Sequence, residues 1–142
     1  MNDVPAAYQD LPRWAFGDNP ALADELLALV FVGKKTATCC SLSQYEDEGW
    51  PILKAGDRWI ALDGAKRPRC VIETTRVEIK RFDEVDADFA RDEGEGDQSY
   101  AYWRRVHEEY FTRQGRFAPD MPLVCERFRL VETLALSKER AQ

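Results

Sequence analysis

Residues 17–40 read Gly-Asp-Asn-Pro-Ala-Leu-Ala-Asp-Glu-Leu-Leu-Ala-Leu-Val-Phe-Val-Gly-Lys-Lys-Thr-Ala-Thr-Cys-Cys, which predicts a helix followed directly by a strand. Asn19 is a favourable N-cap, and Pro20 suits the first helical position because its missing N–H costs no hydrogen bond there. Gly33 is placed to end the helix in a left-handed conformation. The apolar residues of this helix recur at i, i+4, i+7 and i+8 and form one face: Leu22, Leu26, Leu29 and Val30.

The remainder of the chain mixes predicted strands and helices without regular crossover helices. This order favours an α+β fold with a mostly antiparallel sheet that could close into a barrel. Threonine and other β-branched residues favour strands, whereas glycine and proline clusters favour loops. The predicted strands are 36–42, 58–62, 69–79 and 123–134, the predicted helices are 20–32, 83–91 and 99–114, and the predicted loops are 45–55, 92–97 and 115–122.

The length of the chain predicts a single domain, 1–142, that can bury a core without disulfides or metals. Pro5 and Pro12 predict a loosely held arm over about 1–12, and the polar end predicts a frayed tail over about 136–142. No run approaches the ~18 apolar residues of a membrane span, and the N-terminus lacks a signal-peptide pattern. We therefore expect a cytoplasmic protein with no membrane partner, whose oligomeric state the sequence leaves open.

The net charge of −6 argues against broad binding to long nucleic acid, because such binding depends on neutralising phosphates with positive charge. We expect non-specific binding of that kind to be weak or absent, although a local pocket for one nucleotide is compatible with this charge. The cysteines show no Cys-x-x-Cys spacing and there is one histidine, so we expect no metal site and no cofactor. These residues are Cys39, Cys40, Cys70, Cys125 and His107.

Lys34, Lys35, Thr36 and Thr38 bring amines and hydroxyls together at the predicted junction between helix and strand. A structural explanation is open, because lysines near a helix C-terminus are favoured by its dipole and threonines are common in strands. The acidic residues of 92–97 likewise suit the start of the helix that follows them. Strict strand alternation would send Lys35 and Thr38 to opposite faces, so joint chemistry requires Lys35 to lie in the turn.

Five stretches of the chain, in order, resemble the ASCH domain proteins over about residues 13–131. The resemblance implies a PUA-like fold, which is a small mixed or antiparallel β-barrel with flanking helices and a ligand cleft near the Gly-x-Lys turn. It also implies an RNA-related role: one branch hydrolyses N4-acetylcytidine, and another is described as a ribonuclease. The five stretches are Trp14–Asp18, the Leu-Ala-Asp-Glu-Leu helix, Gly33–Thr38, Glu93–Asp97 with Tyr102-Trp103, and Met121–Phe128.

In the amidohydrolase branch a lysine, a threonine three residues later and a distant glutamate carry out the reaction. The matching positions here are Lys35 and Thr38, with Glu93 or Glu95 as the glutamate. Thr38 would attack an acyl carbon, Lys35 would act as its base because a hydroxyl needs one at neutral pH, and Glu93 would relay a proton. Two residues after Thr38, where the family pattern often has arginine, this chain has Cys40.

A cleft near the turn also needs residues that hold the ligand, which we expect to be a modified nucleoside or a short RNA. Gly33 and Thr36 would lie beside the ligand, and aromatic side chains would stack an unpaired base. Two other functions are open, namely a non-catalytic RNA or nucleotide-binding module and a ribonuclease in which the lysine stabilises charge on phosphate. The aromatic candidates for stacking are Trp50, Tyr102 and Trp103.

Overall fold

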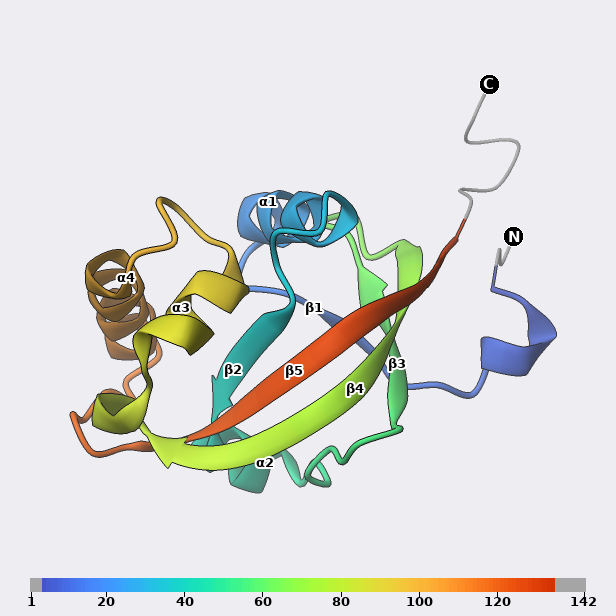
Figure 1. Ribbon diagram of the computed structural model, residues 1–142. Helices are drawn as coiled ribbons and strands as arrows, with labels where there is room; N and C mark the ends of the chain where they lie inside the picture. The colour runs from blue at the N-terminus through green and yellow to red at the C-terminus, as the bar shows by residue number, and fades with distance from the viewer. Residues whose placement is uncertain (1–3, 135–142) are drawn as a thin grey trace.

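The computed structural model describes residues 4–134, and its centre is a five-stranded sheet in the order β1-β3-β4-β5-β2 (Figure 1). Neighbouring strands are antiparallel except β1 and β3, which are parallel. The edge strands β1 and β2 do not pair with each other within residues 4–134. The α+β class with a mixed sheet is therefore confirmed, but closure into a barrel is not shown. The strands are β1 (Arg13–Ala15), β2 (Ala37–Ser41), β3 (Arg58–Leu62), β4 (Pro68–Arg81) and β5 (Pro122–Thr133).

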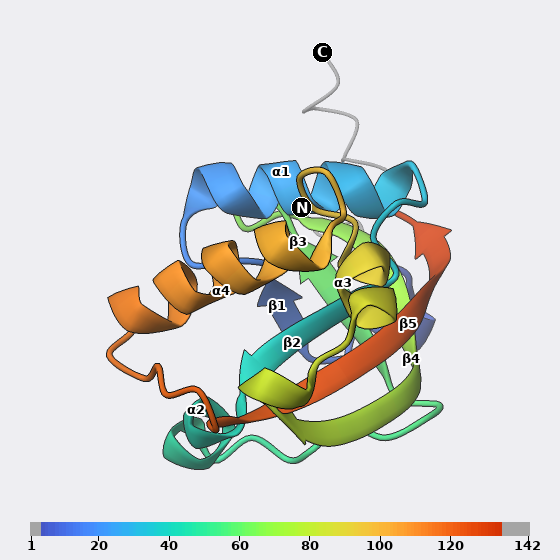
Figure 2. The ribbon, with the colours of Figure 1, turned by 60° about the vertical axis from the view of Figure 1, so that its left-hand side comes forward.

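The helices lie around this sheet in two groups. Helix α1 lies above the sheet and contacts β3, whereas α3 and α4 lie side by side next to β2 (Figures 1 and 2). Within residues 4–134 no helix is long and apolar enough to cross a membrane. The α-helices are α1 (Pro20–Phe31), α2 (Leu42–Glu48), α3 (Ala87–Glu93) and α4 (Tyr100–Arg113), and the 3-10 helices are η1 (Ala6–Tyr8) and η2 (Phe82–Glu84).

The caps read from the sequence are present at α1. The Leu22 N–H donates to Asn19 Oδ1 at 2.8 Å, Pro20 occupies the first turn, and Gly33 has φ +81° just after the helix. A glycine suits that left-handed position because it has no Cβ to clash. The long strands and the helix expected at 99–114 also agree with the structure to within two residues at each end.

A helix, not a loop, occupies the start of the segment that we expected to be the loop 45–55. Ser41 caps α2, because its hydroxyl accepts the Gln44 N–H at 3.2 Å. Gly49 ends the helix with φ +71°, and Tyr45 is buried. The helix has seven residues, too short for a clear apolar period, so the prediction was wrong there.

The described part of the N-terminal arm is held against the sheet, contrary to our expectation of a loose arm. Val4 is buried and packs with Ile60 and Val71. The Ile60 N–H donates to the Pro12 carbonyl at 2.8 Å, and the chain then enters β1, a strand the sequence did not predict. The expected tail at 136–142 lies outside the described residues.

The core is divided by the alternation of side chains along the strands. One cluster lies between α1 and the sheet, and a second lies between the sheet and the helices α3 and α4. The first cluster contains the apolar face of α1 with Phe16, Trp59, Ile72 and Phe128; the second contains Ala37, Phe82, Phe89, Trp103, Phe111, Leu123 and Cys125.

The packing of α1 predicts that one substitution inside the helix and one at its C-cap will change stability by different amounts. Leu27→Ala should lower the free energy of unfolding by about 2–5 kcal/mol, because Leu27 is 2% exposed and truncation leaves a cavity. The control Val32→Ala removes a side chain that is 70% exposed and should change stability by less than about 0.5 kcal/mol. Urea denaturation measures both, and equal effects would contradict the placement of this face.

Candidate functional site

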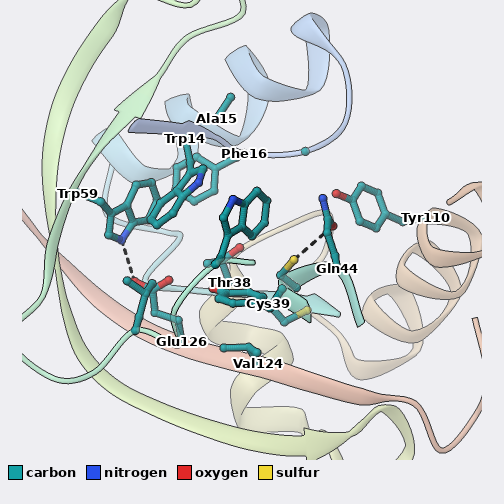
Figure 3. A pocket seen from close by; sticks show the side chains of 15 residues that line it. Trp14, Ala15, Phe16, Thr38, Cys39, Gln44, Trp59, Tyr110, Val124 and Glu126 are labelled. Atoms are coloured by element: carbon teal, nitrogen blue, oxygen red, sulfur yellow. Dashed lines mark hydrogen bonds between the residues drawn. The ribbon is translucent and has the colours of Figure 1, made fainter. Parts of the chain in front are cut away.

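A pocket of about 140 Å³ opens between the edge strands and the helices α2 and α4 (Figure 3). Its wall is aromatic: the Trp14 ring centroid lies 6.0 Å from that of Trp50 and 5.6 Å from that of Trp59, with the rings edge to face. Such a wall can hold a planar ligand by stacking. The lining residues are Trp14, Ala15, Phe16, Gly17, Thr38, Cys39, Cys40, Gln44, Tyr45, Trp50, Leu53, Trp59, Tyr110, Val124 and Glu126.

Thr38 and Glu126 lie opposite each other at the floor of this pocket. They are register partners in the antiparallel pair of β2 and β5. Side chains of directly opposed residues point to the same face, with Cβ atoms about 4.5–5.5 Å apart. A hydroxyl and a carboxylate are thus brought together from residues that are far apart in the sequence (Figure 3).

Glu126 is 4% exposed, and its two oxygens have different surroundings. Its Oε2 accepts the Trp59 Nε1–H at 3.0 Å and the Thr74 hydroxyl at 2.7 Å. Its Oε1 has no hydrogen bond from the described residues. Burial raises the pKa of Glu126, and the hydrogen bonds from Thr74 and Trp59 offset only part of this increase.

Lys35 belongs to a separate buried cluster, between the α1–β2 junction and the helices α3 and α4. Its ammonium is 2.9 Å from Glu93 Oε1 and 2.8 Å from Glu95 Oε2, and it also donates to the Glu93 carbonyl at 3.3 Å. The other oxygen of Glu93 accepts the Trp103 Nε1–H at 2.9 Å. Burial alone would lower the pKa of Lys35, but the two carboxylates outweigh it and raise the pKa above its ordinary value.

A glycine makes the close approach of α3 to this junction possible. Gly94 ends α3 with φ +74°, and a Cβ at this position would lie 2.3 Å from the Lys34 carbonyl oxygen. The adjacent backbone is joined as well, because the Thr36 N–H donates to the Asp92 carbonyl at 2.8 Å. The end of α3 is therefore fixed against the turn that carries Lys35.

The structure divides the residues that we expected to form one site. Thr38 and Trp50 line the pocket, whereas Lys35, Glu93, Glu95 and Trp103 form the buried cluster. Gly33 follows α1, Thr36 bonds to Asp92, and Tyr102 stacks against the Arg105 guanidinium at 5.2 Å, so these three residues lie in neither group.

The protonation of Lys35 argues against its expected role as a general base. An ammonium held by two carboxylates has no free lone pair with which to accept a proton. The buried cluster still influences the pocket electrostatically. Lys35 Nζ lies 5.6 Å from the ring centroid of Phe16, which lines the pocket, and the charge of Lys35 lowers the pKa of Glu126.

Three potential metal ligands come together next to Lys35. Ligand atoms of Cys39, Glu93 and His107 lie within 4.8 Å of one another. However, the two carboxylate oxygens of Glu93 already bond to Lys35 and Trp103. Burial, followed by the charge of Glu93, raises the pKa of the Cys39 thiol, which disfavours the thiolate that a metal requires. We therefore assign no metal to this cluster.

Sequence reasoning missed most of the pocket. Trp59 was noted only as part of a predicted strand, and Trp14 and Glu126 only as parts of family stretches, with no place in the expected site. Glu126 carries a weak signal in the sequence, because it interrupts the apolar run Leu123–Cys125 ahead of Phe128. A charged residue in a strand usually faces solvent, so only its burial distinguishes this carboxylate.

The comparison with known proteins identifies the family. The ASCH domain model matches residues 12–132. The chain belongs to the ASCH domain family. A crystal structure of the ASCH domain from Lactobacillus crispatus JV V101 is similar, with 31% identity and a TM-score of 0.80 over 89% of this chain and 82% of that one.

A second similar structure is that of protein EF3133 from Enterococcus faecalis V583. It shares 39% identity and has a TM-score of 0.77, over 86% of this chain and 77% of that chain. No curated protein matches the sequence. The family and its fold are thus established for this chain, while its activity has to be argued from the site.

The buried cluster predicts a stability effect of neutralising one carboxylate. Glu93→Gln should lower the free energy of unfolding by about 3 kcal/mol, because it removes one of two anions that compensate a buried ammonium. The control Glu78→Gln breaks an exposed pair with Arg76 and should cost less than about 1 kcal/mol. Urea denaturation at pH 7 distinguishes them, and a Glu93→Gln variant as stable as the control would contradict the assignment.

The same cluster predicts how stability depends on pH. Burial opposes ionisation of Glu93, but Lys35 outweighs it and lowers the pKa of Glu93 below its ordinary value of 4.5. A carboxylate with a depressed folded-state pKa stabilises the fold above its unfolded pKa, and this stability is lost as the pH falls through the folded pKa. Below pH 4.5, wild-type stability should therefore fall more steeply than that of Glu93→Gln in urea titrations at constant ionic strength. Parallel curves would show that Glu93 is not stabilised as an anion.

Proposed function

We propose that this ASCH domain protein hydrolyses the amide of an acylated amino-nucleobase, with Thr38 as the nucleophile. The observation that carries the proposal is the Thr38 hydroxyl at the floor of a tryptophan-lined pocket, opposite a buried carboxylate. The resemblance to the amidohydrolase branch of the family supports the same threonine and suggests an N4-acylcytidine as the substrate.

The size and lining of the pocket favour a single base over a long RNA strand. A volume of about 140 Å³ is small beside the ~300–1,000 Å³ typical of pockets for drug-sized ligands. The tryptophans offer flat faces and edges for stacking. The Gln44 side chain supplies a polar contact at the rim; its carbonyl oxygen accepts from the Cys40 thiol at 3.4 Å, and its amide N–H groups make no hydrogen bond with the described residues. A modified nucleoside suits these features better than a polyanion does.

Ribonuclease action at this pocket has less support. Among the described residues, the pocket lining includes no lysine, arginine or histidine that could stabilise a phosphate. His107 lies outside the pocket, and its Nδ1 is 2.9 Å from the Trp103 carbonyl. A non-catalytic sensor of nucleosides is the second candidate, because the aromatic wall could hold a ligand without chemistry at Thr38.

Turnover of N4-acetylcytidine by purified variants tests the proposal. Wild type should release cytidine, Thr38→Val should be inactive because it lacks the hydroxyl, and Thr38→Ser should keep part of the rate. Chromatography of the products gives the rates, and circular dichroism confirms that each variant is folded. Wild-type activity in folded Thr38→Val would refute the nucleophile. Quenching of tryptophan fluorescence by nucleosides without any turnover would instead support the sensor.

A further inference from the structure

We propose that Glu126 is the proton-transfer residue of this site: its Oε1 takes the hydroxyl proton of Thr38 and later delivers it to the leaving nitrogen. This inference rests on the proposed amide hydrolysis and names a catalytic residue for it. The family resemblance assigned no role to the Glu126 carboxylate. In this proposal Glu126 takes the place of Lys35 as the general base for Thr38.

The positions of the two side chains carry the proposal. Thr38 and Glu126 face each other across one rung of the ladder between β2 and β5, on the face that forms the pocket floor. Neither the Thr38 hydroxyl nor Glu126 Oε1 has a hydrogen bond from the described residues, so both are available to a ligand and to each other. Catalytic hydrogen bonds often close only when substrate is bound, which fits this open arrangement.

The hydrogen bonds of Glu126 determine which of its oxygens can react. Trp59 and Thr74 both donate to Oε2, and they hold the carboxylate plane in place. The Trp59 indole N–H can only donate a hydrogen bond, so it cannot accept a proton from Glu126 or from the ligand. The single oxygen left to accept a proton is Oε1, so Trp59 and Thr74 act as positioning residues.

The charges around Glu126 suit a group that gains and loses a proton. Burial raises its pKa; Lys35, from the segment before β2, lowers the pKa, and Asp57, just before β3, raises it. Tyr45 on α2 is another titratable neighbour, and burial, together with Cys40 and Glu126, raises the pKa of that phenol. Within residues 4–134 Glu126 has no ion-pair partner at contact distance, and a carboxylate with a raised pKa is a better base at neutral pH.

The reaction balances with these groups and one water. The Thr38 hydroxyl proton passes to Oε1 as Oγ1 bonds to the acyl carbon. The carbon–nitrogen bond then breaks, and the proton on Oε1 moves to the leaving amine. Water next attacks the acyl-threonine ester, giving a proton to Oε1, and this proton returns to Thr38 as the carboxylic acid departs.

The test uses p-nitrophenyl acetate, an activated ester that reports on the nucleophile without needing recognition of a nucleobase. The difference between the rates of p-nitrophenolate release by wild type and by Thr38→Val is the Thr38-dependent rate. Peptide mass spectrometry identifies the residue that carries the acetyl group. Glu126→Gln should reduce this rate by about 100-fold or more. Glutamine keeps an oxygen for Trp59 and Thr74 but presents an amide that cannot take the proton.

The control and a second variant separate proton transfer from damage to the fold. Glu78→Gln neutralises a carboxylate on β4 that does not line the pocket, and it should leave the rate unchanged. Thr74→Val removes a donor that lowers the pKa of Glu126, so the pH–rate profile should move to higher pH with the nucleophile intact. A merely structural role of Glu126 would not produce this shift.

Each outcome decides a different claim. A Thr38-dependent rate that is equal in wild type and Glu126→Gln, or no Thr38-dependent rate in wild type, overturns the role of Glu126. The turnover of N4-acetylcytidine is measured separately and decides the proposed substrate. An active ester reaction that depends on Glu126, without turnover of the nucleoside, would retain the proton-transfer pair and refute only the substrate.

Discussion

The buried ammonium of Lys35 is the constraint on which the arrangement of this protein depends. A charge that is 1% exposed is tolerated only when opposite charges and hydrogen bonds replace water. Glu93 and Glu95 supply those charges at 2.9 and 2.8 Å, and they come from the end of α3 and the loop after it. Trp103 binds the other oxygen of Glu93 and brings in α4. One ion cluster thus joins the α1–β2 junction to two helices.

Fixing Lys35 also determines what the following strand presents to the pocket. Alternate residues of a strand share a face, and Ala37 and Cys39 of β2 pack toward α3 and α4. Lys35, just before β2, pairs with Glu93 at the end of α3, on the same side of the strand. Thr38 must then point to the other face, where it meets Glu126 across the ladder. The alternation within β2, which turns Ala37 and Cys39 toward the helices, is therefore what places Thr38 in the pocket.

Local signals in the sequence were sufficient to predict the elements that have both capping residues and a clear apolar periodicity. Helix α1 could be predicted because Asn19 and Gly33 mark its ends and its apolar residues share a face. Helix α2 and strand β1 could not, because seven and three residues are too few to show a period. Their stability comes from tertiary contacts, such as the burial of Tyr45, which propensity does not express.

The site was harder to predict because it depends on strand register. The motif around Lys35 and Thr38 was visible in the sequence, and the family resemblance added Glu93. However, Lys35 and Thr38 are close in the sequence without belonging to the same site. Thr38 and Glu126 are brought together only by the pairing of β2 with β5, and no local pattern specifies that partner. The pairing of Lys35 with Glu93, in contrast, satisfies a buried charge and involves no residue of the pocket lining.

Glu93 and Glu126 show how the surroundings give two buried carboxylates different properties. Both are almost fully removed from water, and burial raises the pKa of each. An ammonium in contact reverses this effect at Glu93, so that carboxylate stays ionised and serves the fold. Within residues 4–134, Glu126 has two neutral donors on one oxygen and no cation in contact, which is not enough to reverse the effect of burial. Among the described residues, the carboxylate that lacks a cation partner is the one that faces the pocket, and its protonation would break no buried ion pair.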